Sequence, residues 1–131
     1  MSGVKPLGKI VYVCDDVVSD PASGKMHFLG AFDAIRVPTG GNFPYTLPRM
    51  CVFAQFAGGR GGFSFRVAVV DAASGDETFG SPDCPVNVSA GHTIVTVLIR
   101  MRKCRFPRSG VYLVQLFCDD EFIDDRRLVI T

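Results

Sequence analysis

The stretch that decides the fold runs from residue 63 to residue 69 and reads FSFRVAV. Large Phe and Val side chains occupy every second position, and Ser64 and Arg66 stand between them. Successive side chains of a strand point to opposite faces, so this period of two indicates a β-strand with one buried face. β-Branched and aromatic residues also favour the pleated, half-buried surface of a sheet.

Similar patterns extend outward in both directions. They predict strands at residues 9–15, 25–37, 50–57, 93–102, 111–118 and 122–130, with a short edge strand at Val86–Ser89. No stretch carries the apolar stripe of a helix. We predict an all-β fold with little or no helix: two antiparallel sheets of about seven to nine strands, packed as a Greek-key, immunoglobulin-like or C2-like β-sandwich. With 131 residues, we expect a single domain over residues 1–131.

Three local features refine this expectation. The apolar positions of 25–37 change parity, which predicts a bulge near Asp33 and Ala34 or a strand that switches sheets. Residues 38–48 hold three prolines and two glycines, typical of a long crossover loop. Gly58–Gly62 is expected to be the tip of a hairpin. The predicted core residues are Phe65, Val67, Val97, Ile99, Tyr112, Val114 and Leu116.

Composition excludes several classes of protein. A net charge of +1 and a pI near 7.6 give no overall attraction to nucleic acid or to an anionic membrane. The longest early apolar run, Ile10–Cys14, is too short for a secretory signal or a membrane span. Five cysteines without a C-x-x-C motif indicate free thiols in a reducing compartment, so we expect a cytoplasmic protein.

Several local motifs bear a resemblance to a known family. They are VCDDV at 13–17, GAFDAI at 30–35, FP at 43–44, LPR at 47–49, and FP at 106–107 followed by GVY at 110–112. With these features, over nearly the whole chain, the sequence resembles a family of small bacterial β-sandwich domains of unknown function. The resemblance implies a fold. It supplies no activity and no catalytic residue.

Acidic residues gather in two clusters. They are Asp15, Asp16 and Asp20, and then Asp119, Asp120, Glu121, Asp124 and Asp125. Carboxylates on the loops of a sandwich can bind calcium, which takes six to eight oxygen ligands. The spacing fits no EF-hand, however, and Asp is a favoured turn residue. We interpret these clusters mainly as solvated turns.

Basic and glycine-rich segments offer a second kind of site. The densest positive stretch contains Arg100, Arg102, Lys103, Arg105 and Arg108. It is compatible with phosphate binding, but the outer face of a sheet, or charge that protects a sheet edge, explains it better. The Gly58–Gly62 loop lacks the Lys-Ser/Thr end of a P-loop and leads into a strand, so a plain turn is favoured.

Histidine and cysteine provide little for catalysis. His27 and His92 are isolated, so no zinc site is predicted. Cys84, in a loop flanked by prolines, is the best candidate for a reactive thiol, with His92 as a conceivable partner. No third group that would orient such a pair is evident.

These observations favour a non-enzymatic interaction or accessory module with an unidentified protein partner. Neither catalytic residues, nor a cofactor, nor a metal site is assigned. The alternative is a small-molecule or calcium-binding domain that uses the acidic loops, and a thiol enzyme built on Cys84 ranks third. A weak homodimer is also expected, through the edge at Val86–Ser89 or through Ile94 and Leu98 on the outer face.

Overall fold

The computed structural model describes residues 7–38, 40–57, 59–89 and 94–131. Its strands are β1 (Leu7–Cys14), β2 (Asp16–Ser19), β3 (Met26–Leu29), β4 (Ala34–Ile35), β5 (Tyr45–Ala57), β6 (Gly61–Asp71), β7 (Glu77–Gly80), β8 (Cys84–Val88), β9 (Val95–Phe106), β10 (Gly110–Cys118) and β11 (Glu121–Ile130). The described residues contain no helix, and therefore no helical segment among them that could cross a membrane.

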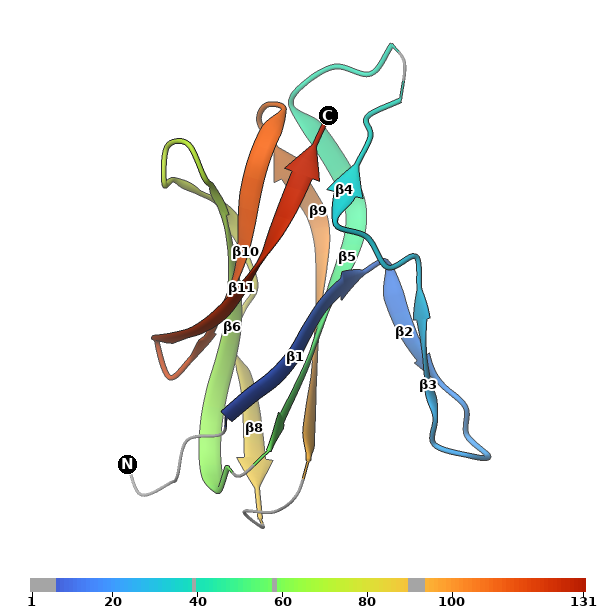
Figure 1. Cartoon of the computed structure of the whole chain (residues 1–131), viewed down its shortest axis with the longest axis vertical. Helices are drawn as coiled ribbons and strands as arrows, with labels where there is room; N and C mark the ends of the chain where they lie inside the picture. The colour runs from blue at the N-terminus through green and yellow to red at the C-terminus, as the bar shows by residue number, and fades with distance from the viewer. Residues whose placement is uncertain (1–6, 39, 58, 90–93) are drawn as a thin grey trace.

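Two sheets face each other and form a sandwich (Figure 1). One sheet has three strands in the order β1-β5-β9. The other has six, in the order β4-β11-β10-β6-β7, with β8 also paired to β6. All pairings are antiparallel except that of β4 with β11. The predicted all-β sandwich is confirmed.

One main core fills the space between the sheets. The seven residues predicted to be buried are all in it: Phe65, Val67, Val97, Ile99, Tyr112, Val114 and Leu116. Across the core, the rings of Phe56 and Phe65 stack with their centroids 4.9 Å apart. The face assignments drawn from the period-two pattern of these strands are therefore confirmed.

The segment 25–37 is not one long strand. Gly30, with φ at +61°, ends β3, and β4 follows after a short irregular stretch. β3 pairs with β2 in a separate two-stranded sheet, whereas β4 pairs with β11. Of the two explanations for the change of parity, the strand that switches sheets is the correct one, and the bulge near Asp33 is not needed.

The glycine-rich link at 58–62 was wrongly expected to be a hairpin. β5 belongs to the three-stranded sheet and β6 to the six-stranded sheet, so the link crosses between them; Gly58 itself lies outside the described residues. Alternation in β5 and β6 reports which face is buried but not which strand is the neighbour. A crossover between sheets and a hairpin therefore look alike in the sequence.

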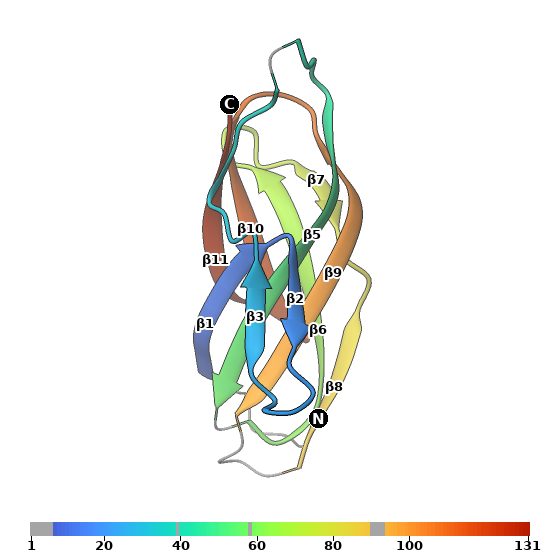
Figure 2. The same cartoon turned by 90° about the vertical axis from the view of Figure 1, so that its right-hand side faces the viewer.

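The described residues form eleven strands, more than the seven to nine expected, because short strands occupy segments that were expected to be turns or parts of longer strands. β2 follows β1 directly and forms with β3 a small hairpin, which we call the β2–β3 hairpin. Figure 2 shows this hairpin lying over the outer face of the three-stranded sheet, in front of β5 and β9. It positions the candidate site.

Candidate functional site

The outer face of the three-stranded sheet changes character in successive cross-strand rows. Met50, Val52 and Ala54 of β5 point into the main core, so the alternate residues of that strand point outward. The outward rows are Tyr12–Phe53–Leu98, then Cys14–Cys51–Arg100, then Arg49–Arg102. Along the strands, this face therefore passes from aromatic to thiol to basic.

The β2–β3 hairpin covers the first two of these rows. Val17 of β2 packs against Cys14, Cys51 and Phe53 in a second, smaller apolar cluster. Leu98 is half-buried at the border of this cluster. Apolar residues on both faces of the first strand are explained in this way, since the hairpin covers one face and the main core lies under the other.

Three rings, those of Tyr12, Phe28 and Phe53, form an aromatic group that is partly exposed where the hairpin meets the sheet. The ring of Phe28 stands edge-on to Phe53, at 4.7 Å between centroids, and to Tyr12, at 5.5 Å. Tyr12 and Phe28 are each 40% exposed, which is unusual for large rings in a well-packed domain. The guanidinium of Arg126 lies 5.7 Å from the centre of the Tyr12 ring, so a cation borders the aromatic group at the β11 side.

The basic row begins where the hairpin ends. Arg49 of β5 and Arg102 of β9 are directly opposite each other, and both are exposed. Like charges in directly opposed positions destabilise a sheet. Arg105, one residue beyond the buried Cys104, extends the basic surface along β9.

Arg100 joins the basic row to the hairpin. Its Nε donates a 2.9 Å hydrogen bond to Oδ1 of Asp16, and its Nη2 donates to the carbonyl oxygen of Val17 at 3.1 Å. The hydrogen bond from Arg100 lowers the pKa of Asp16 and raises that of Arg100. A small hollow of about 70 Å³ is lined by Asp15, Asp16, Arg49 and Arg100, with Arg102 at its side. Three arginines and two aspartates therefore line one hollow.

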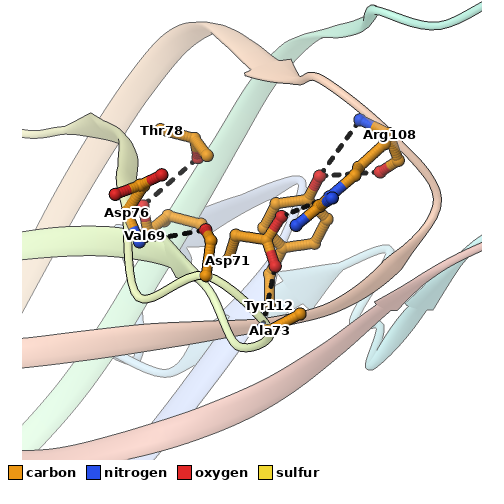
Figure 3. Close-up of polar contacts among 8 residues, drawn as sticks. Val69, Asp71, Ala73, Asp76, Thr78, Arg108 and Tyr112 are labelled. Atoms are coloured by element: carbon orange, nitrogen blue, oxygen red, sulfur yellow. Dashed lines mark hydrogen bonds and ion pairs between the residues drawn. The ribbon is translucent and has the colours of Figure 1, made fainter.

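Arg108 does not belong to this basic surface. It lies in the turn between β9 and β10, and Figure 3 shows its side chain beside Asp71 of β6, where its Nε donates a 2.7 Å hydrogen bond to Oδ2 of Asp71. Oδ1 of Asp71 accepts a hydrogen bond from the backbone N–H of Ala73 at 2.9 Å. The hydrogen bond from Arg108 lowers the pKa of Asp71. This contact is a structural ion pair, so the basic stretch seen in the sequence divides into two unrelated parts.

Most acidic residues at and after the turn between β10 and β11 already form hydrogen bonds or ion pairs within the chain. Asp119 accepts a hydrogen bond from the backbone N–H of Ser64 at 2.9 Å, and Asp120 forms an ion pair with Arg66 at 3.2 Å. Both residues have positive φ, at 49° and 65°, as this tight turn between β10 and β11 requires. Asp124 accepts from the backbone N–H of Asp125.

In the first acidic cluster, at residues 15–20, Asp16 and Asp20 also have hydrogen-bond partners within the chain. Asp20 accepts hydrogen bonds from Ala22 N and from the hydroxyl of Ser23, which lower its pKa, the Ser23 bond most. The two acidic clusters lie on different sheets. Over the described ranges, no three His, Cys, Asp or Glu side chains are grouped so as to hold a metal ion.

The remaining candidate residues, His27, His92 and Cys84, do not form a site in the part of the chain that the structure describes. His27 is an exposed residue of β3, and His92 lies outside the described residues, so its pairing with Cys84 is not placed. Cys84 is the first residue of β8 and packs, half-buried, against the main core. Its expected position in an open loop is therefore wrong, because β8 begins one residue before Pro85 and pairs with β6 there.

Sequence reasoning missed two parts of this surface. The first is Arg49, which is isolated in the sequence and meets Arg102 only through the β5–β9 register. The second is the β2–β3 hairpin with its aromatic group. Tyr12 and Cys14 on the outer face of β1, together with Phe53, were the available signal, because a solvated face does not carry such residues.

Comparison with known proteins gives a family and no activity. No curated protein matches the chain. A family model described as "Family of unknown function (DUF6941)" matches residues 9–131, which is most of the chain and spans both sheets and the β2–β3 hairpin. The chain therefore belongs to this family of unknown function.

Proposed function

We propose that the chain is a non-enzymatic interaction module that binds an acidic segment of a protein partner on the outer face of the three-stranded sheet. The observation that carries this proposal is the exposed pair of Arg49 and Arg102, directly opposed on neighbouring strands. An arrangement that destabilises the free sheet is relieved when an anionic partner binds across both arginines.

The arginines that remain available define the charge of the partner. Asp16 forms an ion pair with Arg100 and interacts with Arg49 only electrostatically, and no ion pair of Arg49 or Arg102 occurs among the described residues. Guanidinium groups bind carboxylates in a bidentate fork, so side chains of Asp and Glu are suitable ligands. A single partner segment with two or more carboxylates can therefore bind both opposed arginines.

The aromatic group supplies the apolar part of the same surface. Tyr12 and Phe28 are exposed two rows away from Arg49, and Val18 and Leu29 of the hairpin are also more than 40% exposed. Aromatic residues and arginine are enriched in protein interfaces and account for much of their binding energy. An acidic segment with one or two apolar side chains is therefore the partner that this face fits.

The proposal is tested by affinity capture from an extract of the native host with three immobilised proteins. These are the wild-type chain, the double variant Arg49→Glu/Arg102→Glu, and the control variant Arg127→Glu. Arg127 is exposed on β11, outside this surface, so the control reverses charge without touching the site. The extract is treated with nuclease in a parallel sample.

We expect the wild-type and control chains to retain the same protein, rich in Asp and Glu at its binding segment, and the double variant to lose it. Binding should weaken as salt is raised. Equal capture by all three chains would contradict the proposal. Capture that disappears after nuclease treatment would replace the protein partner by a nucleic acid.

The proposal includes a reducing, cytoplasmic setting. None of the five cysteines, which all lie in the described ranges, takes part in a disulfide, and Cys14 and Cys51 stand opposite one another as thiols. Free thiols at positions that a disulfide can span are typical of proteins kept in a reducing compartment. Fractionation of host cells with an antibody to the chain tests this assignment.

A further inference from the structure

Cys14 and Cys51 are the one pair of cysteines that the register of the described strands sets directly opposite each other. Opposed residues of antiparallel strands have Cα atoms about 4.5–5.5 Å apart, inside the range of about 4.4–6.8 Å that a disulfide spans. The thiol of Cys14 donates a 3.8 Å hydrogen bond to the carbonyl oxygen of Cys51, and the neighbouring Cys14 side chain contributes to the raised pKa of Cys51. The two side chains are therefore neighbours before any reaction.

The position of the pair separates it from the other cysteines. Cys104 and Cys118 are buried in the main core, and Cys84 packs beside that core. Cys14 and Cys51 lie instead in the small cluster under the β2–β3 hairpin. Opening of the hairpin alone would uncover the pair and leave the main core intact.

The hairpin is suited to such opening. It consists of two strands of four residues each, and an isolated two-stranded hairpin is marginally stable. Its side-chain contacts to the sheet include the Arg100 bonds and the ring of Phe28 on Phe53. Small elements with few buried contacts open locally at a lower free energy than the core does.

The closed state protects the thiols. Both are fully buried, and burial raises the pKa of Cys51 to about 11 and that of Cys14 above its usual value. The thiolate is the reactive form, so oxidation in the closed state is slow. Arg100, next to Cys51 in the same row, supplies a cation that favours the thiolate.

We propose that Cys14 and Cys51 form a reversible intramolecular disulfide, made by exchange with a low-molecular-weight disulfide when the β2–β3 hairpin opens. One cysteine thiolate attacks the small disulfide, forms a mixed disulfide with it and releases one small thiol. The second cysteine thiolate attacks the protein sulfur of that bond and releases the other small thiol. In total, the two cysteines lose two protons and two electrons, and the small disulfide gains both and becomes two thiols.

Peptide mapping tests this inference. The reduced full-length chain is incubated with glutathione disulfide under native conditions, blocked with N-ethylmaleimide and digested with trypsin without reductant. Cys14 then lies in peptide 10–25 and Cys51 in peptide 50–60, and each peptide contains a single cysteine. We expect the two peptides to be joined, the number of free thiols to fall from five to three, and dithiothreitol to restore all five.

Matched variants make the result specific. Cys14→Ser should abolish the joined peptide, whereas Cys104→Ser, which changes a buried thiol in the main core, should retain it. Two glutathione adducts without a joined peptide would overturn the inference. A joined peptide that forms only in urea would do the same, because it would come from the unfolded chain.

The role of the hairpin has its own test. Phe28→Ala removes the ring contact with Phe53 and adds no charge, so the joined peptide should form faster than in the wild type. Phe122→Ala removes an exposed ring from β11, which belongs to the other sheet, and should leave the rate unchanged. Equal rates in the wild type and both variants would contradict the requirement for opening.

Discussion

The phenol hydroxyl of Tyr112 donates a 2.6 Å hydrogen bond to the carbonyl oxygen of Arg108, four residues earlier in the chain. The same hydroxyl accepts a hydrogen bond from the backbone N–H of Arg108 at 3.2 Å. The Tyr112 ring is fully buried and stands edge-on to Phe106 at 5.0 Å. One side chain therefore fixes the turn between β9 and β10 from inside the core, while Arg108 ties that turn to Asp71.

Tyr112→Phe should lower the free energy of unfolding by about 1–2 kcal/mol, because it removes both hydrogen bonds between the hydroxyl and the Arg108 backbone and keeps the ring. Urea denaturation measures the change. The matched control is Tyr12→Phe, since the Tyr12 hydroxyl has no hydrogen bond among the described residues, and its stability should equal that of the wild type. A Tyr112→Phe protein as stable as the control would show that the hydroxyl does not hold the turn.

Gly30→Ala should destabilise the protein more than Gly75→Ala. Both glycines have positive φ, at +61° and +78°, so an alanine at either position carries backbone strain of about 1–2 kcal/mol. A Cβ on Gly30 would also collide with the carboxylate of Asp15, whereas a Cβ on Gly75 meets nothing within 4 Å. The difference between the two urea midpoints therefore measures the contact that closes the end of the β2–β3 hairpin. Equal midpoints would contradict this close approach.

The alternation of apolar and polar residues predicted most accurately those strands that have one face in the main core. Phe65, Val97 and Leu116 were placed correctly because each belongs to a long run in which the period of two repeats several times. The partner of each strand was harder to predict, as the link at Gly58–Gly62 shows, because pairing depends on contacts between distant segments. The candidate surface was missed for the same reason. Arg49 and Arg102, or Cys14 and Cys51, become neighbours only when the register is known.

Lowering the pH should destabilise the protein, over a pH range that is set by the pKa values of Asp71 and Asp16. Hydrogen bonds from Arg108 and Arg100 hold the pKa of these carboxyls below the value of about 3.9 expected in the unfolded chain. Their contribution to stability is therefore complete above that value and is lost as pH falls through their folded-state pKa. Thermal melts from pH 6 downward should show a fall in Tm below about pH 4. Asp71→Asn should have a lower Tm near neutral pH and a weaker dependence on acid, and a dependence like that of the wild type would exclude Asp71 as a source.

Millimolar calcium should leave Tm unchanged. Asp119 and Asp120 are occupied by Ser64 N and by Arg66, and binding of a cation would have to displace these contacts. A ligand that binds only the folded state raises Tm, so calorimetry with calcium and with EDTA gives a direct answer. A rise in Tm that disappears in Asp119→Asn would support the alternative of a calcium-binding domain.

Self-association should occur through β8 and should be weak. Among the described residues, β8 pairs with β6 alone, and β9 pairs with β5 alone, so both have a free edge. β9 is protected by Arg100, Arg102 and Lys103, and the positive φ of Lys103 marks an irregularity that opposes pairing. β8 has no charged residue along Cys84–Val88, so a second copy can add its own β8 there about a two-fold axis.

Light scattering over a range of concentrations should then show a mass that rises above 14.2 kDa. Asn87→Lys adds a charge at an exposed position of β8 and should return the protein to a monomer, whereas Asn42→Lys, in an exposed loop, should behave like the wild type. Val88 is unsuitable for this test, because it is buried in the main core and a lysine there would unfold the sheet. A dimer that persists in Asn87→Lys and dissociates in Ile94→Lys would move the interface to the outer face, where Ile94 is 57% exposed. A constant mass of one chain at all concentrations would exclude both interfaces.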